Sequence, residues 1–496
     1  MKKIAIYGFL LILASLQVAC KDWLDVKPKT AVEEDVLFST EQGFKENLTG
    51  IYLLLASKDL YGRELSYGIT DILAQRYEPG GGSDIPELKF ADNDWYKFPS
   101  VKTEGYVNSI WKNMYKVIAN INNFLTWIDK NKEVLTTPDY YEIMKGEALG
   151  LRGFLHLDIL RLWGPVPGVA SSSEEAIPYV TEMTKDLGRL LSLPYNQVVG
   201  YILRDLNDAE ELLQDDPITG YSMTYLNNPA NAKQGELEDE WHYYRQNRFN
   251  LYAVKATKAR YYLWIGEKEK AGAYANEVIT ALNPDGSEKF RLAQESDAVA
   301  GDLTFTTEHI FSLHNPLLEK IVAPIFVDYE ALTQNEKKLA LAYESTLHPD
   351  DIRFKGNRFW EKRSQPNNLG SAKMYFKKYW QTESTNSGYL QLVPVIRLAE
   401  LYFIAIECAT SAESNRLFHK FRIARNMSAS IDNSLTDETA LYNRLETEYR
   451  KEFYGEGQMF YFFKRNNNPL LTWPEVMTMS AEKYRIPKPE GQIIFE

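Results

Sequence analysis

Apolar residues recur at three- and four-residue steps along most of the chain from about residue 41 onward, which is the spacing of amphipathic helices. One clear example is the series Trp111, Tyr115, Ile118, Ile121 and Phe124. The same spacing predicts further helices over residues 139–163, 250–265, 268–282, 395–409, 414–427 and 438–454, and one that begins after Leu193-Pro194. The chain is therefore expected to be mostly α-helical.

Two of these helices, over residues 250–265 and 268–282, carry small residues at the positions where they would meet. Gly266 between them, Ala271 five residues later and Pro284 after the second helix resemble a tetratricopeptide unit, which is a helix–turn–helix repeat. The spacing elsewhere is irregular, so a regular array is not expected. The fold class that follows is mostly α, a tetratricopeptide-like helical-repeat scaffold.

Two segments interrupt the helical pattern. Residues 214–248 are polar and are expected to form a long connection. Residues 285–392 carry more turns and mixed apolar runs, and residues 308–313 among them are expected to form a short strand or a buried segment. We therefore expect a single body over residues 41–496, with the helical scaffold at about 105–285 and 393–460 and an irregular, loop-rich insertion at about 286–392.

The first residues have the pattern of a secretion signal followed by an anchor. Lys2 and Lys3 precede an apolar stretch, up to Ala19, that is short for a transmembrane helix. A small residue directly before Cys20 resembles the bacterial lipobox, in which the thiol is acylated and becomes the mature N-terminus. We therefore expect a signal peptide over residues 1–19, lipidation at Cys20, and a polar tether over residues 20–40.

Composition narrows the class of function. The 496 residues carry a net charge of −12 with no long run of Lys or Arg, which argues against nucleic-acid binding because phosphates require a basic face. Aromatic residues reach 13%, a surplus that suits both a core and a surface for stacking flat ligands. Cys408 falls in an apolar helical pattern and is expected to be a small buried residue.

Motifs for catalysis or cofactor binding are absent from the sequence. It has no P-loop, HExxH, GxSxG or CxxC motif, and its six histidines are scattered, so neither a metal site nor a cofactor is expected. Acidic residues are abundant, and a pair of carboxyl groups of the glycosidase kind remains open at this level. The chain is expected not to be an enzyme.

Several segments, taken in order, resemble motifs of the SusD/RagB family. They are Asp22-Trp23-Leu24-Asp25-Val26-Lys27-Pro28, Gly146-Glu147-Ala148 with Arg152 and Trp163-Gly164-Pro165, Arg397-Leu398-Ala399-Glu400-Leu401-Tyr402, and Glu448-Tyr449-Arg450-Lys451-Glu452-Phe453-Tyr454-Gly455-Glu456-Gly457. This resemblance spans nearly the whole chain. It implies an outer-membrane lipoprotein, facing the cell exterior, that captures oligosaccharides and hands them to a SusC-like TonB-dependent transporter without catalysis.

Charged residues within the apolar helices of these motifs are expected to be structural. They are Glu147, Arg152, Glu400, Arg422 and Glu452. Because an isolated charge is costly to bury, we expect these side chains to form paired, half-buried networks.

Candidate ligand contacts are loop aromatics flanked by polar side chains, because sugar rings pack their C–H faces on aromatic rings and hydrogen-bond through their hydroxyl groups. The candidates before the first long helix are Asn93, Asp94, Trp95 and Tyr96, with Arg76 and Tyr77 shortly upstream. Those in the insertion are Trp360, Tyr379 and Trp380. Packing in the core is the alternative for each aromatic residue. The resembled family also places binding aromatics in these two regions.

Three other functions remain open. A peptide-binding uptake component of the RagB type would have a roomier, more polar cavity that binds backbone amides. A surface glycoside hydrolase would need two carboxyl groups roughly 5–10 Å apart beside a cleft. A structural scaffold would have no pocket for a small ligand. The sequence does not identify the glycan.

Overall fold

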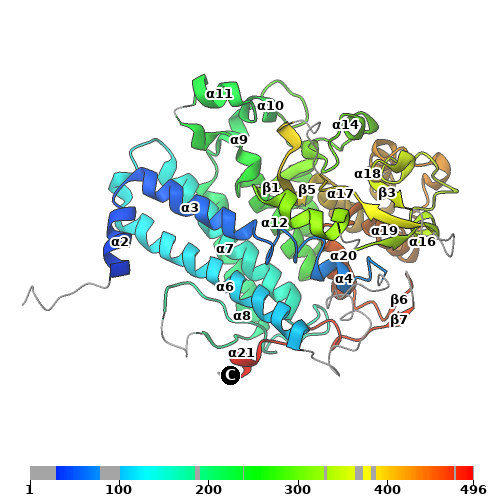
Figure 1. Cartoon of the computed structure of the whole chain (residues 1–496), viewed down its shortest axis with the longest axis horizontal. Helices are drawn as coiled ribbons and strands as arrows, with labels where there is room; N and C mark the ends of the chain where they lie inside the picture. Colours follow the sequence, from blue (N-terminus) through cyan, green and yellow to red (C-terminus); the bar gives the residue numbers. More distant parts are fainter. Residues whose placement is uncertain are drawn as a thin grey trace, which may run out of the picture.

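The computed structural model describes residues 29–78, 101–184, 190–237, 239–328, 332–363, 372–380, 387–473 and 476–494. Helices dominate these residues, which confirms the predicted fold class (Figure 1). The predicted signal peptide, Cys20 and the start of the predicted tether lie outside the described residues. The rest of that tether contains a helix, α2 (Lys29–Leu37), and Phe38 directly after it is fully buried.

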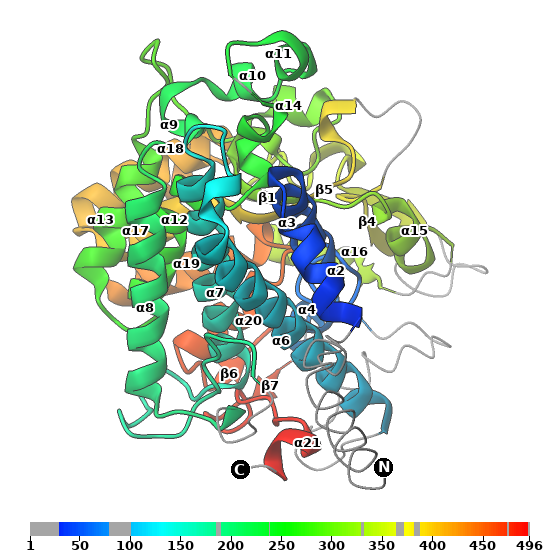
Figure 2. The ribbon, with the colours of Figure 1, turned by 90° about the vertical axis from the view of Figure 1, so that its left-hand side faces the viewer.

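The scaffold is a series of helices in which each packs against its neighbours along the chain (Figures 1 and 2). Its helices are α3 (Glu41–Leu55), α6 (Val101–Lys130), α7 (Tyr140–Trp163), α8 (Tyr195–Leu212), α12 (Leu251–Trp264), α13 (Lys268–Ile279), α17 (Leu398–Cys408), α18 (Ser411–Ala424), α19 (Glu438–Glu452) and α20 (Gln458–Arg465). α7 packs on both α6 and α8, α12 on both α8 and α13, and α17 on α13, α18 and α19. Stacking of successive helices in this way is the tetratricopeptide-like arrangement. Among the described residues, no helix combines the length and the hydropathy that a membrane span requires.

α7 lies deep within the scaffold, and all of its residues from Gly146 to Trp163 are buried. Two glycines make close packing possible there. A Cβ atom at Gly146 would lie 2.6 Å from the Cγ atom of Leu213, and one at Gly150 would lie 2.6 Å from the Cδ1 atom of Phe249. The absence of a side chain at these positions therefore sets how closely the neighbouring segments approach α7.

The insertion contributes two small sheets. β1 (His309–His314) pairs antiparallel with β5 (Leu392–Arg397). β4 (Lys373–Phe376) lies between β2 (Gln334–Asn335) and β3 (Trp360–Arg363) and is antiparallel to both. The strand that the sequence offers as one interpretation of residues 308–313 is therefore confirmed as β1.

Two apolar clusters form the core. The larger one fills the scaffold and includes the inner faces of α6, α7, α12 and α17. The second cluster joins the insertion to α4 (Ile69–Leu73) and its flanks, and to Tyr454 after α19. Its aromatic members are Tyr67, Tyr77, Phe305, Phe326, Tyr343, Phe359, Trp360, Phe376, Tyr379 and Tyr454.

Two sequence-based predictions are wrong in detail. The segment 214–248 contains short helices, α9 (Pro217–Gly220), α10 (Met223–Leu226) and α11 (Pro229–Gln234), with two 3₁₀ turns after them. Asp216 and Asn228 cap α9 and α11, each of which begins with proline, so local capping stabilises them without a long periodic pattern. The helix predicted from residue 395 begins at Leu398, because residues 395–397 belong to β5 and are buried on both faces.

The charged residues of the apolar helices are paired, as predicted, but all five are buried and not half-buried. Glu147 accepts a 2.5 Å hydrogen bond from Arg245, and Arg152 binds Asp205 at 2.5 Å. Glu400 accepts two bonds of 2.7 Å from Arg260. The remaining two predicted members follow the same rule, since Arg422 pairs with Asp432 and Glu452 with Arg397 and Arg425.

Candidate ligand-binding site

Asn93, Asp94, Trp95 and Tyr96 lie outside the described residues, which stop at Glu78 and resume at residue 101. Glu78 itself forms a β-bridge with Thr333 and an ion pair of 2.6 Å with Lys338. The described chain before these four candidates therefore ends on the surface between α4 and the insertion.

Three other candidates, the adjacent Arg76 and Tyr77 and the distant Trp360, meet around the ring of Tyr454. The guanidinium carbon of Arg76 lies 4.3 Å from the centroid of that ring. The ring of Tyr77 lies 5.5 Å from it and that of Trp360 4.7 Å from it, both edge-on. All three side chains are buried, with 1%, 5% and 1% of their surface exposed. In this conformation they pack within the second cluster, which is the alternative role that the sequence left open for the aromatic residues.

The last two candidates lie at the margin of the same cluster. Tyr379 is 1% exposed, donates a 2.8 Å hydrogen bond to the carbonyl of Gly455 and packs 5.4 Å from Tyr67. Trp380 is half-buried, and its ring lies 5.8 Å from the guanidinium carbon of Arg363. Trp380 is thus less buried than Tyr379 and is the more accessible of these two candidates.

Trp473 is an aromatic residue of this region that the sequence analysis did not select. Its half-buried ring lies 5.5 Å from the guanidinium carbon of Arg76 and 5.6 Å from that of Arg450. Its indole N–H donates a 3.1 Å hydrogen bond to the carbonyl of Lys338, which in turn pairs with Glu78. A half-exposed indole ring held by a backbone bond and flanked by charged side chains has the chemistry of a sugar-stacking platform. We call the surface of Trp473, Lys338, Arg450 and Glu78 the Trp473 edge.

Arg76 lies beneath this edge and has few partners. One Nη atom donates to the backbone carbonyl of Arg450, whereas Nε and the other Nη atom are buried and find no hydrogen-bond partner among the described residues. The residue before it, Gln75, adopts a left-handed conformation with φ of 56°. Such a conformation is strained for a residue with a side chain.

Asp71 is the acidic residue that acts electrostatically on Arg76. Burial raises the pKa of Asp71 to about 7, against the lowering effects of the Arg76 charge and of the N–H groups of Gly455 and Gly457. Those N–H groups donate to the carboxyl group at 2.7 and 3.1 Å. Asp71 therefore fixes the turn after α19, and it is only partly ionised at neutral pH.

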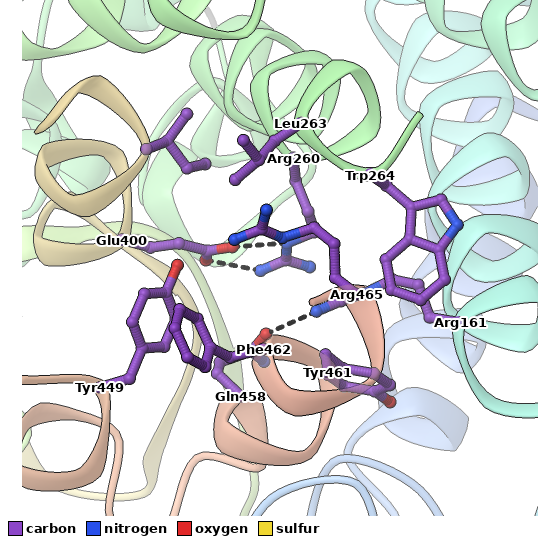
Figure 3. A pocket seen from close by; sticks show the side chains of 11 residues that line it. Arg161, Arg260, Leu263, Trp264, Glu400, Tyr449, Gln458, Tyr461, Phe462 and Arg465 are labelled. Atoms are coloured by element: carbon purple, nitrogen blue, oxygen red, sulfur yellow. Dashed lines mark hydrogen bonds and ion pairs between the residues drawn. The ribbon is translucent and has the colours of Figure 1, made fainter. Parts of the chain in front are cut away.

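A pocket opens elsewhere, between α7, α12, α17, α19 and α20 (Figure 3). Arg161, Arg260 and Arg465 line it together with Glu400, and Arg161 donates a 3.0 Å hydrogen bond to Gln458. Its volume of about 30 Å³ has room for one or two water molecules. The pocket is therefore too small for a sugar ring.

Two buried carboxyl groups, those of Glu308 and Glu452, are held in structural ion pairs. Glu308 and Glu452 each accept hydrogen bonds from both Arg397 and Arg425. Burial alone would raise the pKa of Glu452, but the charges of Arg425 and Arg397 hold it well below its usual range. Among the residues that the structure describes, no group of three or more His, Cys, Asp and Glu side chains is arranged to hold a metal ion.

Comparison with known proteins agrees with this architecture. Residues 22–234 match the SusD-like family described as starch-binding and associating with the outer membrane. A SusD-like protein of Formosa agariphila is 25% identical over 214 residues, a match that covers 42% of this chain and 37% of that protein. The chain thus matches well under half the length of that relative.

Solved structures extend the similarity to almost the whole chain. A SusD superfamily protein from Bacteroides thetaiotaomicron superposes with a TM-score of 0.69 at 21% identity, covering 92% of this chain and 98% of that one. A SusD-like carbohydrate binding protein from Bacteroides vulgatus superposes with a TM-score of 0.65 at 16% identity, covering 92% and 96%. At these identities the superpositions establish the shared fold.

Proposed function

We propose that the chain is a SusD-like protein: a cell-surface oligosaccharide-binding lipoprotein that delivers captured glycan to a SusC-like TonB-dependent transporter in the outer membrane. The observation that carries this proposal is the fold shared over 92% of the chain with a protein described as carbohydrate binding. The family description, starch-binding and associating with the outer membrane, supports the same class of ligand and the same location.

The binding site that we propose combines the Trp473 edge with the sequence-predicted aromatics. Trp473 would stack on the C–H face of a sugar ring, while Lys338, Arg450 and Glu78 would hydrogen-bond to its hydroxyl groups. Asn93, Asp94, Trp95 and Tyr96 follow Glu78 in the chain and would add further ring and amide contacts. Trp380, half-buried beside Arg363, is the proposed contact within the insertion.

In this proposal the protein binds and releases glycan without breaking bonds. A retaining or inverting glycosidase needs two carboxyl groups roughly 5–10 Å apart beside a cleft, one of them free to carry a proton. Glu308 and Glu452 are fixed instead between arginines and are fully or almost fully buried. The proposed anchor is an acylated Cys20, which would hold the body at the outer face of the membrane through several acyl chains.

The test is a glycan array probed with the mature protein, with a peptide library printed on the same surface. We expect the protein to bind printed glycans and not to bind printed peptides. Each retained glycan is then incubated with the protein and its products are separated by chromatography. Retention of peptides alone, or the appearance of shorter glycans, would refute the proposed function.

A further inference from the structure

Arg76 differs from the other buried arginines of the described chain. Each of the others has a carboxylate within 4 Å; they are Arg152, Arg161, Arg245, Arg260, Arg353, Arg397, Arg422 and Arg425. Arg76 is 1% exposed and has no such partner among the described residues, and two of its three guanidinium nitrogens make no hydrogen bond. No carboxylate of the described residues therefore pairs directly with its buried positive charge.

A buried arginine cannot remove its charge by losing a proton, as a buried lysine can. Burial lowers the pKa of Lys289 to about 8, and burial together with the charges of Arg485 and Arg161 holds the pKa of Lys464 well below its usual range. Both amines are buried without a carboxylate and donate to backbone carbonyls, and both can lose their proton. A guanidinium group keeps its charge in proteins, so the desolvation cost of Arg76 is offset only in part, by its bond to the carbonyl of Arg450 and by the ring of Tyr454.

The surroundings of Arg76 leave an excess of positive charge at the Trp473 edge. The charges of Glu78 and Lys338 cancel each other, as do those of Arg450 and Glu446, which pair at 2.5 Å. Burial lowers the pKa of Arg450, and although Glu446 opposes this change, the nearby charge of Arg76 adds to it. Asp71 is the remaining acid, and with a pKa of about 7 it offsets only part of the charge of Arg76.

We propose that the glycan bound at the Trp473 edge is acidic and that its carboxylate or sulfate group serves as the counterion of Arg76. This inference rests on the proposed function and names its ligand class. The Trp473 ring lies 5.5 Å from the guanidinium carbon, so an acidic group on a sugar stacked there acts on Arg76 through a medium of low dielectric. Uronic acids and sulfated sugars share this chemistry.

The first test needs no glycan. Arg76→Met keeps an unbranched apolar chain in place and removes the uncompensated charge, so we expect its thermal midpoint to equal or exceed that of the unchanged protein. Arg422→Met is the matched control, because Arg422 also donates to one backbone carbonyl but has a carboxylate partner, Asp432. We expect this control to lower the midpoint. An equal decrease of the thermal midpoint in both variants would mean that other groups of the protein already compensate the charge of Arg76. That result would refute the inference.

The second test measures selectivity by titration calorimetry. Its probes are an oligogalacturonide, the same oligomer with methyl-esterified carboxyl groups, a sulfated oligosaccharide and a neutral malto-oligosaccharide. We expect one of the acidic probes to bind at least about tenfold more tightly than every neutral probe. That preference should disappear in Arg76→Met.

The outcomes separate the two proposals. Preference for the free-acid oligogalacturonide or for the sulfated probe identifies the source of the anion and supports the inference. If neutral probes bind as tightly as acidic ones and their affinity is unchanged in Arg76→Met, the inference is overturned. The proposed function then stays intact. If none of the probes binds and the glycan array is also blank, the proposed function itself is refuted.

Discussion

Glu452, the last residue of α19, accepts a hydrogen bond of 2.9 Å from Arg397, the last residue of β5, and Arg397 is 1% exposed. The same carboxylate accepts from Arg425 at 2.7 and 2.9 Å and from Arg353 of the insertion at 3.2 Å. The scaffold and the insertion are thus joined by buried ion pairs in addition to the second apolar cluster. Because each partner is desolvated, the network tolerates the loss of a member poorly.

Glu452→Gln tests this role. The amide removes one negative charge from three arginines, whose other partners are Glu308, Glu456, Asp351 and Glu448. Because the network is buried, we expect this partial loss of compensation to cost roughly 3–5 kcal/mol in the free energy of unfolding. Chemical denaturation followed by circular dichroism measures it. Glu413→Gln is the control, because Glu413 pairs with Arg416 on the exposed face of α18, and there we expect a change below about 1 kcal/mol. Similar losses in both variants would contradict a special role for the buried network.

Gly150 sets the spacing between α7 and the start of α12. A methyl group there would meet the ring of Phe249 at 2.6 Å, so we expect Gly150→Ala to destabilise the protein by about 1–3 kcal/mol. Gly105 in α6 has open space around it, and Gly105→Ala should be neutral or stabilise by roughly 0.5–1 kcal/mol through helix propensity. Thermal unfolding of the two variants distinguishes close packing from helix propensity, and a stable Gly150→Ala would contradict the close contact.

Stability should depend on pH in opposite directions through two buried acids. Burial raises the pKa of Asp71 to about 7, so the folded state binds its proton more tightly than the unfolded state does, and stability falls as pH rises from about 4 to 7. For Glu448, burial is outweighed by Lys451, Arg353 and Arg444, which lower its pKa to about 2. Its contribution is present above the unfolded pKa and is lost as pH falls from about 4.5 toward 2.

Asp71→Asn isolates the contribution of Asp71 to the pH dependence of stability. The variant cannot ionise, so the decline in unfolding free energy between pH 5 and 7 should become shallower than in the unchanged protein. Denaturation at a series of pH values gives both slopes. Identical slopes would mean that Asp71 titrates in the folded state as it does in the unfolded chain.

The periodic part of the fold can be predicted from sequence, because long helices such as α7 and α12 repeat their buried positions over several turns. The start of α17 is less predictable, since the buried strand β5 runs directly into it and the apolar residues form one continuous stretch. Helices of four to six residues such as α9 and α11 depend on caps at Asp216 and Asn228 and are too short to show a period.

The candidate site is harder to predict, because tertiary contacts create it. Arg76, Tyr77 and Trp360 are selected by residue type, but their packing around Tyr454 depends on how the insertion closes against α4. Trp473 lies in an irregular segment without a hydrophobic period, and its position beside Arg76 and Arg450 is a long-range contact. That Arg76 forms no ion pair with any described residue has no signature in the sequence.

Cys20→Ser tests the predicted anchor. Loss of the thiol prevents acylation, so we expect the protein to move from the membrane fraction to the soluble fraction after cell lysis. Mass spectrometry of the membrane-bound form should also give a mass above that of the polypeptide that begins at Cys20. A variant that stays with the membrane, or an unmodified mass, would contradict lipidation.

The measurement that tests the central claim most directly is calorimetric titration of Trp473→Ala with a glycan retained on the array. Loss of the stacking platform should weaken binding by about tenfold or more, and Trp95→Ala should weaken it as well. Tyr201→Ala is the control, because Tyr201 is an aromatic residue exposed on α8, remote from the Trp473 edge, and its loss should leave affinity unchanged. Unchanged affinity in Trp473→Ala would contradict the proposed site.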